Sequence, residues 1–236
     1  MLKKLCLSLL LVTGVWGAPQ PNVLKGQVKD SRGVPLAGVK VFADNTLLYN
    51  TNAIAVSDAA GKYSVSVARP AGTWHATAQI ERTLNGQKYV FPLHPDSDDV
   101  FAGNLGAVRN FVWKLQGERP EGGHYGGKVI GYGVLSNPFY IETGKVELTL
   151  EPQGNLVDGS VGKTISGALQ RTPDGDAIVD VPVARYKITA RYLDPENAGP
   201  LLVRLRNQGE FGPQVVADFK VITTTVHHIE VEVKSP

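Results

Sequence analysis

The sequence predicts an all-β protein built from two antiparallel β-sandwich domains in tandem. Three observations predict this fold class. Many short segments alternate apolar with polar residues, as strands with one buried face do. The boundaries between these segments carry glycine, proline, asparagine or aspartate, and the 236-residue chain holds 26 glycines and 15 prolines. Nowhere does a helical period persist for three turns.

The first seventeen residues have the features of a cleaved signal peptide. Lys3 and Lys4 precede an apolar run, Leu5–Val12, and Val15–Gly17 offers small-residue positions for cleavage before Ala18. The run is too short for a membrane span with stable flanks. We therefore expect a secreted, extracytoplasmic protein, in the periplasm or at the cell surface, without a membrane span after signal cleavage. A retained N-terminal anchor is the alternative.

The first domain is expected over residues 18–115. Its clearest local signal is Asn85-Gly86, because this pair readily adopts the positive φ angles of a two-residue hairpin turn. Trp74 and Trp113 fall on the apolar faces of their segments and are expected in the core. The expected strands are Val23–Lys29, Val39–Ala43, Ala53–Ser57, Lys62–Ala68, Thr73–Leu84, Gln87–Phe91 and Leu105–Leu115.

Four blocks of this domain occur in a characteristic order. They read Gly26-Gln27-Val28-Lys29-Asp30, then Gly33-Val34-Pro35-Leu36-Ala37-Gly38-Val39-Lys40-Val41, then Ser57–Val67 and Pro70–Ala78. This order resembles the carboxypeptidase regulatory-like family, clearly over residues 23–82 and extending to about residue 115. The resemblance implies a transthyretin-like, Ig-like β-sandwich that serves secreted and surface proteins as a scaffold and not as a catalyst.

A polar segment rich in glycine and proline, QGERPEGG, follows the first domain and marks a linker over residues 116–124. Residues 125–236 are expected to form the second β-sandwich, because strict alternation returns there. Its expected strands are Lys145–Glu151, Tyr186–Tyr192, Leu201–Arg206, Val215–Lys220 and Ile229–Val233.

Sulfur content and charge exclude several classes of function. Cys6 is the only cysteine and lies in the signal, so the mature chain has no disulfide, no thiolate nucleophile and no cysteine-ligated metal. The chain has 24 basic and 22 acidic residues, and removing Lys3 and Lys4 with the signal leaves 22 of each. A neutral chain argues against a nucleic-acid partner, which requires a basic excess.

Aromatic side chains offer the best binding chemistry, because sugar rings stack on exposed aromatic faces. Tyr125, Tyr132, Phe139 and Tyr140 lie in less regular segments and are the candidate ligand-binding residues for a glycan. The alternative is that they are ordinary aromatic residues of loops and edge strands.

Asp96, Asp98 and Asp99 pack three carboxylates into four residues, and such a loop could hold calcium. A solvated acidic turn is the alternative. No other cofactor is expected.

Two apparent catalytic motifs fail on physical grounds. His227-His228-Ile229-Glu230 has the letters of a zinc-peptidase pair, but residues three apart in a strand point to opposite faces. We interpret His228 and Glu230 as solvent-facing residues of an edge strand. Gly159–Thr164 lacks the first glycine of a phosphate loop. No catalytic constellation is left, so we expect a protein that is not an enzyme.

Basic residues of the second domain could form a ladder that meets anionic envelope polymers. Acidic residues on neighbouring strands could equally neutralise it, and this second interpretation is favoured. The basic residues are Arg185, Lys187, Arg191, Arg204 and Arg206, and the acidic ones are Asp218, Glu230 and Glu232.

The sequence therefore predicts a secreted, non-catalytic surface or envelope protein that binds a glycan or a protein partner through sandwich loops and edges. A purely structural subunit or spacer of a cell-surface assembly, joined by strand addition, is the alternative. A hydrolase without a recognisable motif is the third hypothesis. The oligomeric state is not predicted.

Overall fold

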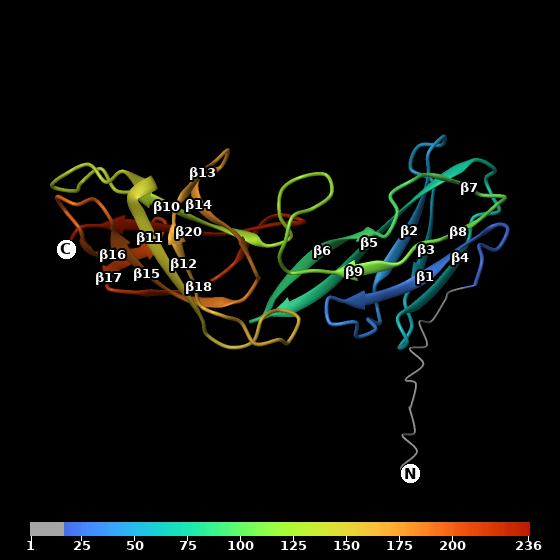
Figure 1. Ribbon diagram of the computed structural model, residues 1–236, viewed down its shortest axis with the longest axis horizontal. Coiled ribbons are helices and arrows are strands. Elements are labelled where there is room, and N and C mark those ends of the chain that lie inside the picture. Colours follow the sequence, from blue (N-terminus) through green and yellow to red (C-terminus); the bar gives the residue numbers. More distant parts are fainter. Residues whose placement is uncertain (1–16) are drawn as a thin grey trace, which may run out of the picture. The chain divides into compact units, whose positions relative to one another are not determined.

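The computed structural model describes residues 17–236, which form a two-domain, all-β protein (Figure 1). The predicted signal peptide lies almost wholly outside the described residues. Within them, the only helical element is the short 3-10 turn η1 (Thr143–Lys145). No helix in this part of the chain is long and apolar enough to cross a membrane.

The chain divides into two compact units. The first contains the described residues up to Lys29 together with 35–78 and 94–111, and the second contains 30–34, 79–93 and 112–236. The outer half of the long β5–β6 hairpin therefore groups with the second unit, although its strands belong to the first sheet.

Alternating burial explains the strands of the first sheet. In β1 every second residue is buried, which sends Leu24 and Val28 to the core with no exposed surface. The sheet has the order β3-β2-β5-β6-β9-β1-β4, with β7 on β5 and β8 on β1, and its two end strands β3 and β4 contact each other. The strands are β1 (Val23–Asp30), β2 (Lys40–Asn45), β3 (Asn52–Val56), β4 (Lys62–Ser66), β5 (Thr73–Leu84), β6 (Gln87–Pro95), β7 (Phe101–Ala102), β8 (Ala107–Val108) and β9 (Phe111–Trp113).

Two features of the first sheet were predicted correctly. Asn85 and Gly86 form the hairpin turn between β5 and β6 with φ angles of 51° and 80°. Trp74 and Trp113 are in the core, with 1% and 3% of their surface exposed.

The expected single strand over residues 105–115 is instead two short strands, β8 and β9. Arg109 and Asn110 interrupt it, because their polar groups form hydrogen bonds with neighbouring segments. The Tyr63 hydroxyl donates to the Arg109 carbonyl at 2.6 Å, and the Gln27 amide donates to the Asn110 side chain at 3.0 Å. A Cβ on Gly26 would lie 1.6 Å from the Arg109 oxygen, so this close approach requires glycine.

The second domain also forms one large sheet, in the order β12-β11-β15-β16-β20-β10-β14-β13, with β17, β18 and β19 paired to β16, β15 and β20. Leu148, Tyr186, Ile188 and Val231 have no exposed surface and lie in its core. The strands are β10 (Gly127–Gly133), β11 (Val146–Pro152), β12 (Ile165–Ala168), β13 (Gln170–Thr172), β14 (Gly175–Val181), β15 (Arg185–Tyr192), β16 (Gly199–Leu205), β17 (Gln208–Gly212), β18 (Val215–Asp218), β19 (Lys220–Thr223) and β20 (Val226–Lys234).

Candidate binding site

Tyr125 was expected to be exposed, but the structure shows the opposite. The side chain is buried, with 9% of its surface exposed, and this burial raises the pKa of its hydroxyl. The Lys114 ammonium and the Arg119 guanidinium lie 5.5 and 5.8 Å from the ring centroid. These two cations occupy the space beside the ring. Tyr125 is therefore a packing residue at the start of the second domain.

Tyr132 is half-buried on β10, and a charged side chain covers its ring. The Arg206 guanidinium carbon lies 3.8 Å from the ring centroid, and the Tyr132 hydroxyl donates to Glu230 Oε1 at 2.9 Å. Burial first, and the hydrogen bond to Glu230 second, raise the pKa of the Tyr132 hydroxyl. A ligand could stack on this ring only after displacing the guanidinium.

Phe139 and Tyr140 lie together in the loop between β10 and η1. They line a hollow of about 210 Å³. Phe139 is half-buried and stacks on Tyr192, with ring centroids 5.9 Å apart and planes 29° apart. Tyr140 is 83% exposed and Leu135 is fully exposed. The hollow is lined by Gly133, Val134, Leu135, Asn137, Pro138, Phe139, Tyr140 and Ile141.

Side chains of the second domain fix the ends of this loop. The Asn137 side chain donates to the Val134 carbonyl at 3.0 Å and accepts from the Ser235 amide at 2.9 Å, which ties the loop to the C-terminal segment. The Glu142 amide donates to the Tyr192 hydroxyl at 3.1 Å. The role of Asn137 was not predicted, although Asn-Pro is a recognised signal for a turn.

The chemistry of the hollow is neutral. None of its lining side chains is charged. Pro138 has no N–H, and the turn at Leu135 and Ser136 directs the Asn137 N–H to the Val134 carbonyl. Within residues 17–236, the N–H groups of Leu135, Ser136, Phe139 and Tyr140 donate to no backbone carbonyl. An exposed aromatic face beside unpaired amide donors suits a ring that carries hydroxyl groups.

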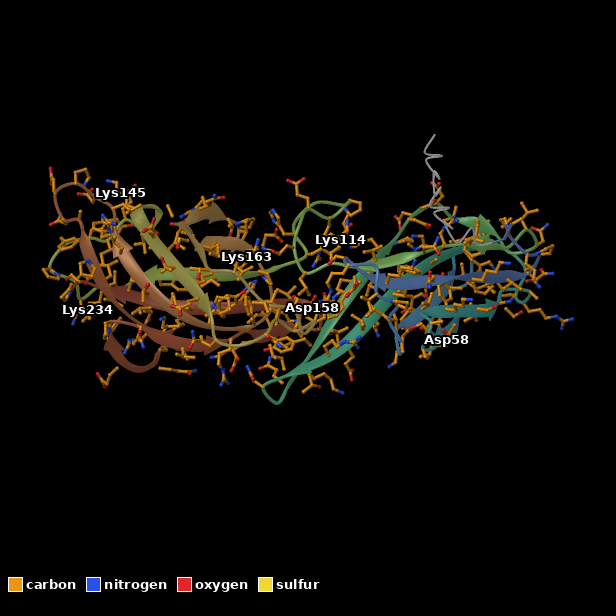
Figure 2. The ribbon with its side chains drawn as sticks, turned by 60° about the horizontal axis from the view of Figure 1, so that its bottom comes forward. Asp58, Lys114, Lys145, Asp158, Lys163 and Lys234 are labelled. Atoms are coloured by element: carbon orange, nitrogen blue, oxygen red, sulfur yellow. The ribbon has the colours of Figure 1, made fainter. Side chains whose placement is uncertain are left out.

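The charges next to the loop neutralise one another. Lys145 at the end of η1 contacts Glu142 at 2.8 Å and Asp194 at 2.9 Å. The hydrogen bonds to Glu142 and Asp194 raise the pKa of Lys145, and the bond from Lys145 lowers the pKa of Asp194. Figure 2 shows Lys145 and Lys234 at this end of the domain.

The three carboxylates proposed as calcium ligands do not converge. Asp96 accepts from the amide and the side chain of Asn110 at 3.0 and 2.8 Å, and Asp98 contacts His75 Nε2 at 2.8 Å. Asp99 accepts from the Ser97 hydroxyl at 3.0 Å. The part of the chain that the structure describes contains no group of three His, Cys, Asp or Glu residues placed to hold a metal ion. Through these contacts, the carboxylates hold the loop that follows β6 in place.

The interpretation of His228 as a solvent-facing residue of an edge strand was wrong. β20 lies inside the sheet between β16 and β10, and His227 and His228 are 5% and 9% exposed. Burial lowers the pKa of both imidazoles, and that of His227 falls to about 4.

The prediction that acidic residues neutralise the basic ladder is confirmed for Arg185, Arg204 and Arg206, whereas Lys187 pairs with an acidic residue that was not predicted and Arg191 has no ion pair among the described residues. Arg185 contacts Asp218 at 2.5 Å, and Lys187 pairs with Glu151. The remaining pairs are Arg204–Glu232 at 2.7 Å and Arg206–Glu230 at 2.9 Å.

No protein-family model matches the chain, and no curated protein matches it. Three solved structures show a distant likeness. The Bacillus anthracis TIE protein is 12% identical with a TM-score of 0.32, and the match covers 90% of this chain and 34% of that one. A C-terminal fragment of the pilus adhesin SpaC from Lactobacillus rhamnosus GG is 9% identical with a TM-score of 0.31, covering 92% and 98%. The major pilin T-13 of Streptococcus pyogenes is 12% identical with a TM-score of 0.25, covering 93% and 98%. The resemblance to the carboxypeptidase regulatory-like family stays a prediction.

Proposed function

We propose that this chain is a non-catalytic cell-surface protein whose second domain binds a neutral saccharide in the hollow of the β10–η1 loop. One observation carries the proposal. Tyr140 is 83% exposed beside an uncharged hollow, and the N–H groups of Leu135, Phe139 and Tyr140 have no backbone partner within the described chain. A ring face and free hydrogen-bond donors together match the two surfaces of a sugar, its C–H face and its hydroxyl groups.

The size of the hollow limits the ligand. Pockets that enclose a drug-sized molecule measure roughly 300–1,000 Å³, whereas this hollow measures about 210 Å³. We therefore expect it to hold a single sugar ring, with the rest of a saccharide outside. Such a contact is weak for one site, and we expect dissociation constants on the order of 1 mM for monosaccharides.

The test compares Tyr140→Ala with Tyr49→Ala. Tyr49 is fully exposed and belongs to the first domain, so its loss is a matched control. The purified protein is screened against an array of neutral and acidic saccharides, and binding of glucose, galactose, mannose and N-acetylglucosamine is measured by calorimetry. We expect a neutral sugar to bind, Tyr140→Ala to weaken it about tenfold, and Tyr49→Ala to leave it unchanged. No sugar binding by the wild type, or equal effects of the two variants, would overturn the proposal.

A second candidate function is a structural subunit that joins its neighbours through a sheet edge. One observation favours it. β3 ends the hydrogen-bonded strand order of the first sheet, where it contacts the other end strand β4, and it exposes Ile54 and Val56, which are 54% and 58% accessible to solvent. Exposed apolar groups on an end strand are characteristic of strand addition.

A further inference from the structure

A cleft of about 570 Å³ lies in the second unit, apart from the saccharide hollow. Its walls are mainly the loop between β11 and β12 and the segment that follows β9, and no described residue lines both the cleft and the hollow. Every described residue that lines the cleft belongs to the second unit. Pockets that enclose a drug-sized molecule measure roughly 300–1,000 Å³, so the cleft is large enough for a small organic ligand.

Hydrogen bonds hold both walls in place. In the β11–β12 loop, the Leu156 N–H donates to the Ser160 carbonyl, and the Gly159 N–H donates to the Leu156 carbonyl, each at 2.8 Å. In the other wall, the Gln116 side chain donates to the Asp180 carbonyl at 3.1 Å. A ligand therefore meets a site whose backbone is already ordered, which lowers the cost of binding.

Two ammonium groups of the cleft have no carboxylate partner. Lys114 and Lys163 are exposed, and neither forms an ion pair with any residue that the structure describes. The Lys114 ammonium lies 5.5 Å from the centroid of the Tyr125 ring. A ring face attracts a cation without neutralising it, so both lysines keep their charge for a ligand.

The one carboxylate among the described lining residues, Asp158, is already engaged. Its Oδ1 accepts from the amide and the hydroxyl of Ser160 at 2.9 and 2.5 Å, and 8% of its side chain is exposed. Figure 2 labels Lys114, Asp158 and Lys163, the charged residues of the cleft. Two ammonium groups and one carboxylate leave one positive charge, which a single anionic group balances.

Aliphatic side chains supply the rest of the binding surface. They belong to Leu115, Leu156, Val161, Ile165 and Pro182. Val161 is 85% exposed, so a ligand that covers it removes apolar surface from water. Among the described residues that line the cleft none is aromatic, and the cleft therefore lacks the ring face on which a sugar stacks.

We propose that this cleft binds a small organic carboxylate that has an apolar body. The ammonium groups of Lys114 and Lys163 hold the carboxylate, and Val161 and the neighbouring aliphatic side chains hold the apolar body. The positive charge selects an anion, and the aliphatic wall selects an apolar chain over a sugar. This second site goes beyond the proposed function and does not depend on the saccharide hollow.

Calorimetry with octanoate tests the ligand class, because octanoate joins one carboxylate to an apolar chain. Octanamide keeps the chain without the charge, and acetate keeps the charge without the chain. We measure at about 20 mM sodium chloride, where charges are weakly screened. We expect a dissociation constant on the order of 0.1–1 mM for octanoate and at least about tenfold weaker binding of the other two compounds. No binding of octanoate, or equal affinities for octanoate and octanamide, would overturn the proposal.

Removal of one charge tests the location of the site. Lys163→Gln removes an ammonium group from the cleft, and Lys40→Gln is the matched control because Lys40 is an exposed lysine of the first unit. We expect Lys163→Gln to weaken octanoate binding about fivefold or more, Lys163→Arg to retain most of it, and Lys40→Gln to leave it unchanged. Equal effects of Lys163→Gln and Lys40→Gln would overturn the assignment to this cleft.

A carboxylate placed inside the cleft gives an independent test. Val161→Asp and Val161→Asn are similar in size and differ in charge, and circular dichroism checks that both fold. We expect Val161→Asp to bind octanoate at least about tenfold more weakly than Val161→Asn, because the new carboxylate pairs with the lysines and repels the ligand. Equal affinities of the two variants would contradict the proposal. Neutral sugar binding by Val161→Asp should equal that of the wild type, so failure of this site and failure of the saccharide site are separate results.

Discussion

A single carboxylate, Asp180, holds the linker against the second domain. It has a φ angle of 58° and follows the central part of β14. Its two oxygens accept from the amides of Gly117 and Gly126 at 2.8 and 3.0 Å. Hydrogen bonds to a charged acceptor are among the stronger ones in proteins.

Replacing this carboxylate should destabilise the protein. We expect Asp180→Ala to lower the free energy of unfolding by about 2 kcal/mol, because two amides lose a charged acceptor and alanine tolerates a positive φ poorly. Asp180→Asn should cost less than half as much, since asparagine accepts one of the bonds and tolerates this backbone conformation. The urea midpoints of the three proteins measure the difference. Equal midpoints for Asp180→Ala and the wild type would contradict this role.

His227 makes the stability of the protein depend on pH. Burial first, and the nearby positive charges of His228 and Arg119 second, lower its pKa from 6.5 to about 4. Its folded pKa lies below the unfolded value, so between these two values the unfolded state binds more protons. Stability therefore falls as pH falls from 6.5 towards 4, and this histidine adds no further change below its folded pKa.

Removing the imidazole should flatten that dependence. The loss across this window is at most about 3 kcal/mol for one histidine. We expect His227→Phe to show a smaller shift in urea midpoint between pH 7 and pH 4 (about the window above) than the wild type, with His228 supplying the remainder. An equal shift in both proteins would show that groups other than His227 cause the loss of stability in this pH range.

At the scale of elements, alternation predicted strands wherever one face is buried and the other is solvated. β1, β11 and β15 follow this rule, with every second residue buried along most of each strand. β10 was missed because the sequence GKVIGYG does not alternate and three consecutive residues, Val129 to Gly131, are buried. The strand lies inside the sheet. A buried glycine in such a strand allows close packing, and it adds nothing to the alternation of apolar and polar residues.

Only part of the candidate site was predicted, because the rest depends on contacts between residues far apart in the sequence. Phe139 and Tyr140 were chosen for their aromatic chemistry, and the structure brings these two into one hollow. The burial of Tyr125 depends on packing of the linker segment, and the covering of Tyr132 depends on Arg206, which is 74 positions away along the chain. Local patterns carry no information about such long-range contacts.

Gly127 shows why β10 needs glycine. A Cβ at this position would lie 2.4 Å from a ring carbon of Phe219 and 2.7 Å from the His227 carbonyl oxygen. We expect Gly127→Ala to cost about 1–3 kcal/mol through overpacking. Gly167→Ala is the matched control on β12, where a Cβ meets nothing within 4 Å, and should be neutral or slightly stabilising. Thermal unfolding of the two variants distinguishes them, and equal melting temperatures would contradict the packing argument.

At the scale of the whole molecule, basic and acidic residues are balanced in number, and many of them also form individual ion pairs. Residues 18–236 hold equal numbers of basic and acidic residues, and Arg185, Arg204 and Arg206 of the second sheet pair with neighbouring carboxylates. Exposed pairs of this kind contribute little to stability, and their main effect is to leave the surface without a strong field.

This balance predicts how binding responds to salt. Because the β10–η1 hollow has no charged lining residue, sugar affinity should change less than about twofold between 50 mM and 500 mM sodium chloride, whereas a charged ligand would lose much more. Calorimetry at both salt concentrations measures this. A steep loss of affinity with salt would point to an ionic site elsewhere on the protein.

The most direct test of the saccharide site is an amide NMR titration of the purified protein with the neutral sugar that binds best on the array. We expect the largest shifts on the amides of Leu135, Ser136, Phe139 and Tyr140, which have no backbone partner within the described residues, and we expect Tyr140→Ala to reduce them. Shifts confined to other segments, or no shifts at sugar concentrations near 10 mM (about ten times the expected dissociation constant), would contradict it.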